Sequence, residues 1–354
     1  MATLNFGKTV TLKQAANIIM STPMNRYFLQ GEPGIGKSSL LSTLSASLPN
    51  HEVAYIDVPN MDLGDIAMPV IDRETKTTAY YPNSRFKIHL GKPVITMLDE
   101  YSKGADPIKN MLHPMLEVKP RLADLFLHDE SITFLTGNLG SDGVGDSLKA
   151  HSRNRIIPLH VSKPTASEWL EWAVNNNIEG LVMAWVDQFP HAMASYLDEG
   201  QDTNPYIYNP KKMQTAFVSP RSLERVSNIV RVRDKLDTDS LICAMTGAVG
   251  EAASRDMQAF VEYQDQTPTW ESIIKNPKTV AVPDSAGACS VVVFGAITRI
   301  TKDTIAPFMD YLSRFEPEWQ ATFAINVAKN PQKQGIAFSS NAFKQWVLKN
   351  EDLL

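Results

Sequence analysis

The sequence predicts an α/β fold, in which helices cover a parallel sheet, followed by a part made of helices alone. Over roughly the first 160 residues, apolar runs rich in Val, Ile, Phe and Thr alternate with helical or loop segments. Such alternation is typical of strands joined by crossover connections, and therefore of a parallel sheet. Beyond Ser162 the hydrophobic spacing is helical, and all six tryptophans lie between Trp169 and Trp346.

Five apolar runs are the expected strands of the sheet. They cover residues 26–30, 52–58, 93–99, 131–137 and 155–161. Helices are expected over residues 12–21 and 38–48, and a glycine-rich turn separates the first strand from the second of these helices. We therefore assign residues 1–163 to one α/β domain.

The rest of the chain is predicted to be helical. Thr165 and Glu168 have the spacing of a capping box at the start of a helix over residues 165–177. Further helices are expected over residues 219–232, 239–263, 304–329 and 340–350, whereas Pro, Asp and Gly indicate a loop-rich stretch over residues 263–290. We divide this part into a helical domain, residues 164–262, and a helical C-terminal extension, residues 263–354.

The glycine-rich turn carries a phosphate-binding motif. Residues 31–38 read GEPGIGKS and fit the pattern G-x-x-x-x-G-K-[ST], for which an ordinary glycine-rich turn is the alternative. Glycines let the backbone fold around phosphate oxygens, so that successive N–H groups face the anion. We expect Lys37 to contact the β- and γ-phosphates of ATP and the Ser38 hydroxyl to bind Mg²⁺. The expected nucleotide-binding residues are Gly31, Glu32, Pro33, Gly34, Ile35, Gly36, Lys37, Ser38 and Ser39.

Polar side chains also follow two of the other predicted strands. Asp99 and Glu100 end the run PVITMLDE, where Asp99 can hold the Mg²⁺ shell and Glu100 can orient and deprotonate the attacking water. Asn138 follows the run SITFLTG, and its amide can reach a γ-phosphate or that water. Acidic residues are common at strand ends and Asn is common in turns. The interpretation therefore depends on the order of the three motifs along the chain.

In this order the motifs resemble those of the AAA+ ATPases, and within them the MoxR-like group. The matching stretches are GEPGIGKS, MDLGDIAMP, VITMLDE, FLTGN, GVGDSLKAHSRNR and VSPRSLERV, and the resemblance covers roughly residues 5–235. It implies an αβα P-loop NTPase domain, an all-helical lid and a ring, often a hexamer. By the same resemblance Asn138 and Arg221 are nucleotide sensors, and Arg155 is an arginine finger offered to a neighbouring subunit. Arg153 can serve as the finger instead.

The resemblance implies an ATPase motor that remodels or assembles a protein partner, and related proteins often act with a partner that carries a von Willebrand A-type domain. The alternative is a nucleic-acid-associated AAA+ ATPase of clamp-loader or helicase type. The formal net charge of -5 and the lack of a long basic run count against this alternative. The intact Lys37, Asp99, Glu100 and Arg155 count against a non-catalytic nucleotide-binding scaffold.

The remaining features of the sequence concern the cellular location of the protein. Cys243 and Cys289 lie in apolar surroundings, which suits buried thiols in a reducing cytoplasm. The first residues have no signal-peptide core, and no run reaches the roughly 18 apolar residues of a membrane span. We therefore expect a cytoplasmic protein that makes no membrane contact.

Residues 69–92 form a long polar stretch that contains the pair Tyr80 and Tyr81. A pore or partner loop and a plain β-hairpin are equally consistent with this stretch. Beyond about residue 265 the resemblance to the family is weak, so the sequence assigns no role to that region.

Overall fold

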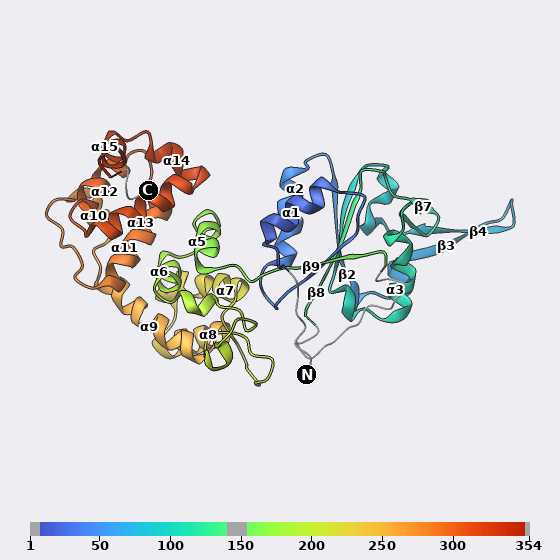
Figure 1. The fold of residues 1–354 in the computed structure, drawn as a ribbon, viewed down its shortest axis with the longest axis horizontal. Helices are drawn as coiled ribbons and strands as arrows, with labels where there is room; N and C mark the ends of the chain where they lie inside the picture. The colour runs from blue at the N-terminus through green and yellow to red at the C-terminus, as the bar shows by residue number, and fades with distance from the viewer. Residues whose placement is uncertain (1–7, 140–153, 351–354) are drawn as a thin grey trace. The chain divides into compact units, whose positions relative to one another are not determined.

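A five-stranded parallel sheet forms the centre of the first of two units of the chain, residues 1–163 and 164–354 (Figure 1). The computed structural model describes residues 8–139 and 154–350. The strands are β1 (Tyr27–Gln30), β2 (Glu52–Asp57), β5 (Val94–Asp99), β8 (Ile132–Gly137) and β9 (Ile157–His160). They lie in the order β2-β5-β8-β1-β9, and every neighbouring pair is parallel. The predicted α/β fold is confirmed, and each strand lies within its predicted run.

Both faces of the sheet are covered, which explains why the strands are continuously apolar. All six residues of β8 are buried. On one face, Met97 of β5 packs in a core with residues of α1 (Leu12–Ser21) and α2 (Leu40–Ser47). On the other face, the next residue, Leu98, packs in a core with residues of α3 (Asp106–Leu112). Because successive side chains of a strand point to opposite faces, β1, β5 and β8 each contribute to both cores and hold three layers together.

A hairpin projects from the first unit (Figure 1). In the sequence it lies between β2 and β5. Its strands β3 (Ala67–Asp72) and β4 (Thr77–Pro82) pair antiparallel, and both Tyr80 and Tyr81 are about half exposed. The backbone N–H of Tyr80 donates to a carboxylate oxygen of Asp124 (2.6 Å). Asp124 lies in a second, short hairpin, whose strands are β6 (Arg121–Leu122) and β7 (Leu125–Phe126). Part of the polar stretch at residues 69–92 is therefore a β-hairpin, and its contact with a partner stays a prediction.

The second unit is helical. Its α-helices are α5 (Ala166–Asn175), α6 (Gly180–Gln188), α7 (Pro220–Arg231), α8 (Thr238–Val249), α9 (Glu251–Gln266), α10 (Trp270–Lys275), α11 (Ala286–Arg299), α12 (Ile305–Leu312), α13 (Pro317–Lys329), α14 (Pro331–Ala337) and α15 (Asn341–Lys349). α11 packs against α6, α9 and α13, and helices from both sides of residue 263 share one hydrophobic core. The division into residues 164–262 and 263–354 stays a prediction.

Several helices of this unit differ from the expectation. The single helix expected over residues 239–263 is two helices, because Gly250, with φ 89°, separates α8 from α9. The stretch at residues 263–290, expected to be rich in loops, contains α10 and the start of α11. α11 is apolar on all sides, as suits a helix at the centre of a core, and so it lacks the amphipathic pattern that marks surface helices. The capping box of Thr165 and Glu168 is confirmed at the start of α5.

Within residues 8–139 and 154–350, no helix combines the length and the apolar character that a membrane crossing requires.

Asp187, near the end of α6, gives the stability of the second unit a predicted pH dependence. Its burial, and then the negative charge of Glu318 on α13, raise the pKa of Asp187 from 3.8 to about 6. The folded chain thus holds a proton that the unfolded chain releases near pH 3.8, so stability falls as pH rises through about 4 to 6. We expect Asp187→Asn to raise the free energy of unfolding by about 1–3 kcal/mol at neutral pH.

Urea unfolding of both proteins at a series of pH values measures this effect. The stability gain of Asp187→Asn should shrink toward pH 4, where the native carboxyl is itself protonated. Asp310→Asn, at an exposed position of α12, is the matched control and should give no such gain. A gain that stays constant across the pH range would contradict the prediction.

Candidate nucleotide site

The loop between β1 and α2 has the backbone that its glycines allow. Gly34 and Gly36 have φ angles of 77° and 98°, in the left-handed region that other residues rarely adopt. Gly31 lies against the backbone of β9's end, where a Cβ would come within 2.7 Å of the Val161 carbonyl oxygen. After Gly36 a 3₁₀ turn, Lys37–Ser39, leads directly into α2. A glycine-rich loop that runs into a helix N-terminus is suited to bind an anion.

The other predicted residues of the loop differ in exposure. The side chains of Glu32 and Ile35 are buried, whereas Ser38 is partly exposed on the first turn. The Ser39 hydroxyl donates to the carbonyl oxygen of Gly36 (2.7 Å) and so closes the turn.

Lys37 connects this loop to the neighbouring strand. Its side chain is buried, and its Nζ donates to the carbonyl oxygens of Gly31 (2.7 Å) and Glu32 (2.8 Å) and to Oδ1 of Asn138 (3.2 Å). Asn138 directly follows β8, which pairs with β1. The fold thus brings together two residues that lie 101 positions apart and that the sequence predicted to act on one phosphate group.

Asp99, the last residue of β5, is held through both oxygens of its carboxylate. The Thr136 hydroxyl of β8 donates to Oδ1, and the Tyr55 hydroxyl of β2 donates to Oδ2 (2.8 Å). Partial burial, the hydrogen bond to Asp99 and the neighbouring carboxylates raise the pKa of Tyr55 to about 12. The phenol therefore stays protonated at neutral pH and remains a donor. The strands on either side of β5 together fix the orientation of this carboxylate.

The sequence did not predict Tyr55 or Thr136 as site residues. Tyr55 lies two residues before Asp57, so the two side chains share one face of β2. The register of β2 and β5, which places Asp57 opposite Asp99, is what brings Tyr55 to that carboxylate. Since the register joins strands far apart in the sequence, the local pattern held no signal for Tyr55. Thr136 is one of two threonines in an otherwise apolar strand, so the pattern held no signal that distinguished it from Thr133.

Glu100 has an unusual backbone conformation. Its φ is 49°, in the left-handed region, which costs a residue other than glycine on the order of 1–3 kcal/mol. Its backbone N–H donates to the Thr136 hydroxyl (3.1 Å), and its carboxylate forms an ion pair with Lys103 Nζ (2.5 Å). These contacts hold the strained residue beside Asp99, and such strain occurs preferentially at functional sites.

Arg155 lies at the opposite edge of the sheet from the loop of its own chain. It is exposed and precedes β9, whose first residue, Ile157, pairs with Tyr27 at the start of β1. The phosphate-binding loop instead follows Gln30, at the end of β1. The first unit therefore brings together Lys37, Asp99, Glu100 and Asn138 at one edge of the sheet and leaves Arg155 outside that group.

Two further arginines were predicted for the site. Arg153 lies outside the described residues. Arg221 is exposed at the second position of α7 in the second unit, and the Ser219 side chain caps this helix.

Part of the first unit is similar to a known protein family. Residues 26–128 match the AAA domain family of the dynein-related subfamily. No curated protein matches the chain.

Solved structures give weaker matches. An ATPase described as putative, from Cytophaga hutchinsonii, is 14% identical with a TM-score of 0.31, covering 74% of this chain and 91% of that one. A RuvB mutant from Thermogota maritima is 14% identical with a TM-score of 0.38, covering 73% and 77%. NtrX from Brucella abortus, in complex with ADP, is 11% identical with a TM-score of 0.35, covering 97% and 67%.

The family assignment therefore rests on the sequence match and not on these structural likenesses. The match spans the phosphate-binding loop and the Asp99–Glu100 pair, which are the motifs of the resemblance that the structure brings to one edge of the sheet. Residues 26–128 of the chain thus resemble the AAA domain of the dynein-related subfamily, an AAA+ P-loop domain.

Proposed function

We propose that the protein hydrolyses ATP to ADP and phosphate and uses the energy to remodel or assemble a protein partner. The observation that carries the proposal is the cluster at the carboxyl edge of the sheet, where Lys37 hydrogen-bonds Asn138 and where Asp99 and Glu100 end the adjacent strand. A phosphate-binding lysine, a metal-binding carboxylate and a potential base are the groups that phosphoryl transfer to water requires.

The loop and Lys37 would hold the nucleotide. The residues from Gly31 to Ser39 offer backbone N–H groups to the phosphates, and the left-handed glycines let the backbone approach them without Cβ atoms in the way. Lys37 has a buried ammonium that already donates to three oxygens. It can exchange those partners for phosphate oxygens, a charge-assisted contact that is stronger than one to a neutral carbonyl.

Ser38 and Asp99 fit Mg²⁺, because this ion is usually held by one or two protein oxygens together with substrate phosphates and water. When bound, Mg²⁺ supplies positive charge that neutralises the phosphates. The hydrogen bonds from Tyr55 and Thr136 keep the Asp99 carboxylate in one orientation and leave further lone pairs for the metal shell.

Glu100 would accept a proton from the attacking water, and Asn138 would orient that water or a γ-phosphate oxygen. The side-chain amide of Asn138 remains a donor while its Oδ1 accepts from Lys37. The Glu100 carboxylate is positioned by its ion pair with Lys103 (2.5 Å).

Arg155 would act on a neighbouring subunit. Its position at the far edge of the sheet leaves it unable to serve the loop of its own chain, whereas a ring would place it beside the next subunit's nucleotide. We propose that Arg221, at the start of α7, reports the nucleotide state to a helical lid and that the assembly is a ring, probed first as a hexamer. The partner is proposed to be a protein, for which one with a von Willebrand A-type domain is the first candidate.

Glu100→Gln should separate binding from hydrolysis. The change removes the base but keeps the size and polarity of the side chain, so ATP and Mg²⁺ should still bind while kcat falls by about a hundred-fold or more. Lys37→Ala should instead weaken nucleotide binding itself. Phosphate release and nucleotide binding, measured on purified variants, test both expectations. Normal turnover by Glu100→Gln would refute the role of Glu100.

Tyr55→Phe should weaken the response to Mg²⁺, because Asp99 loses one of the two hydroxyls that orient it. We expect the Mg²⁺ concentration at half-maximal hydrolysis to rise by about three- to ten-fold, with a smaller change in kcat. Thr136→Val should have a larger effect and Thr136→Ser should restore the native value. Tyr80→Phe, on the exposed hairpin, is the matched control. An unchanged Mg²⁺ dependence in both Tyr55→Phe and Thr136→Val would contradict the orienting role.

Arg155→Ala subunits should be inactive alone and regain activity when mixed with Lys37→Ala subunits. Each interface needs one intact loop and one intact finger, and mixed rings contain some interfaces that have both. Hydrolysis as a function of the mixing ratio measures this complementation, and gel filtration verifies that rings form. Arg121→Ala, at an exposed arginine of the same unit, is the control. If rings form and no mixing ratio restores hydrolysis, Arg155 is not the arginine finger, and Arg153→Ala is tested next.

A further inference from the structure

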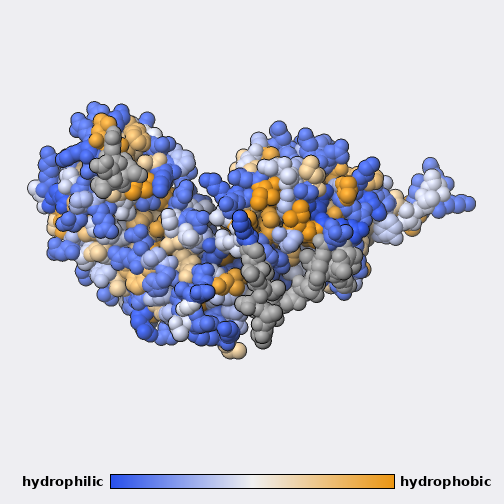
Figure 2. Space-filling view, viewed as in Figure 1, coloured by the Kyte–Doolittle hydropathy of each residue, from blue (hydrophilic) through white to orange (hydrophobic). Residues whose placement is uncertain are grey.

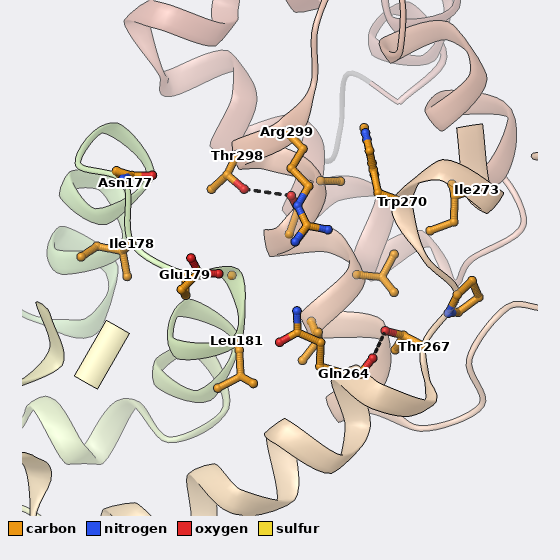
Figure 3. Close-up of a pocket in the computed structure, with 16 residues that line it drawn as sticks. Asn177, Ile178, Glu179, Leu181, Gln264, Thr267, Trp270, Ile273, Thr298 and Arg299 are labelled. Carbon is orange, nitrogen blue, oxygen red and sulfur yellow. Dashed lines mark hydrogen bonds between the residues drawn. The ribbon is translucent and has the colours of Figure 1, made fainter. Parts of the chain in front are cut away.

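A cavity of about 250 Å³ lies inside the helical unit, and none of the residues that line it belongs to the proposed nucleotide site (Figure 3). The start of α6, the end of α9, the segment that enters α10 and the last turns of α11 surround it. Its size suits a small ligand or the end of a chain, since cavities for drug-sized molecules begin at about 300 Å³.

Two glycines give the cavity its shape. α6 crosses α11 so closely that a Cβ on Gly180 would lie 2.6 Å from the backbone nitrogen of Gly295. Gly295 itself meets nothing within 4 Å at its own Cβ position, although it lies in the middle of a helix, where glycine costs about 1 kcal/mol relative to alanine. Packing at its Cβ position therefore does not require a glycine at residue 295, whereas a larger side chain there would extend into the cavity that Gly295 lines.

The charges at the cavity favour an anion. Its charged lining residues are Glu179 and Arg299. Glu179 is neutralised by an ion pair with Arg231 (2.9 Å), whereas within the described parts of the chain no carboxylate pairs with Arg299. Arg299 is exposed, and its guanidinium points to the space between α6 and α10 (Figure 3). The start of α6, which has no side-chain cap, adds the partial positive charge of a helix N-terminus to the same space.

A second polar group in the cavity lining needs a hydrogen-bond donor. The Oε1 atom of Gln264 is buried and has no hydrogen-bond partner among the residues that the structure describes, and the Gln264 side chain lines the cavity below Arg299 (Figure 3). Polar atoms make up most of the lining, and its apolar residues include Trp270, Ile178 and Ile273. The cavity thus offers a cation, an acceptor and an apolar wall within one small volume.

We propose that this cavity binds an acylated α-amino acid carboxylate. Arg299 would bind the carboxylate in a bidentate manner, Gln264 Oε1 would accept from the amide N–H, and the apolar side chain would pack on Trp270. Two sources carry this chemistry: a free N-acyl amino acid and the last residue of a peptide chain. The site is independent of ATP hydrolysis and does not rest on the function proposed above.

Calorimetric titration of the full-length protein distinguishes the two sources. The probes are N-acetyl-leucine and the tripeptide acetyl-Ala-Ala-Leu, each with a free carboxylate and each as its C-terminal amide. We expect at least one free acid to bind with a Kd of about 1 mM or below. Its amide should bind about ten-fold or more weakly, because the charge-assisted bond to Arg299 is lost. Binding of the tripeptide alone would identify the source as a chain end.

Two variants locate the site. Arg299→Gln, at an exposed position, should weaken binding of the free acid by about ten-fold and leave the amide unaffected. Gly295→Leu should fill the cavity and abolish binding. Gly247→Leu is its matched control, because Gly247 also lies inside a helix, has open space at its Cβ and is not part of the cavity lining.

The proposal is overturned if neither free acid shows binding at a ligand concentration about ten-fold above the expected Kd of about 1 mM. It is also overturned if the amides bind as well as the acids. It is also overturned if Arg299→Gln leaves the affinity unchanged. Should Gly295→Leu fail to fold, Gly295→Ala and Arg299→Gln still decide the outcome, since both substitutions suit a helix.

Discussion

The parallel register of β1, β5 and β8 is the constraint on which the proposed chemistry depends. It aligns Gln30 with Gly137 and so sets the phosphate-binding loop beside Asn138. The register of β5 and β8 brings the end of β5 beside Thr136, whose hydroxyl serves both Asp99 and Glu100. Because a slip by one residue would turn every side chain to the opposite face, the register and the two cores enforce each other.

The two hydrophobic cores protect that alignment in different ways. Strand β8 is buried along its whole length, so each of its side chains has a fixed environment on one face or the other. Gly137 is the last residue of this strand, and a Cβ there would lie 2.7 Å from the Phe28 ring and 2.9 Å from the Ser102 hydroxyl. The position between Thr136 and Asn138 therefore has no room for a side chain. Close packing thus extends to the edge of the sheet at which the polar residues gather.

The sequence could predict much of this site because loop and strand-end chemistry is local. Spacing alone located Lys37, and an apolar run that ends in two acids located Asp99 and Glu100. Tyr55 could not be found this way, since its contact with Asp99 depends on strand pairing across 44 positions. The helices of the second unit were harder to predict from the sequence, for another reason. α11 is apolar on all sides and β-branched in its middle, which a local pattern does not distinguish from a buried strand.

The crossing of α6 and α11 has a mechanical consequence. Helices that meet backbone to backbone, as at Gly180 and Gly295, have no side chains between them that could rearrange to let one slide over the other. α6 and α11 lie far apart in the sequence, so this crossing joins two distant segments of the helical unit, and any motion of one helix would carry the other with it.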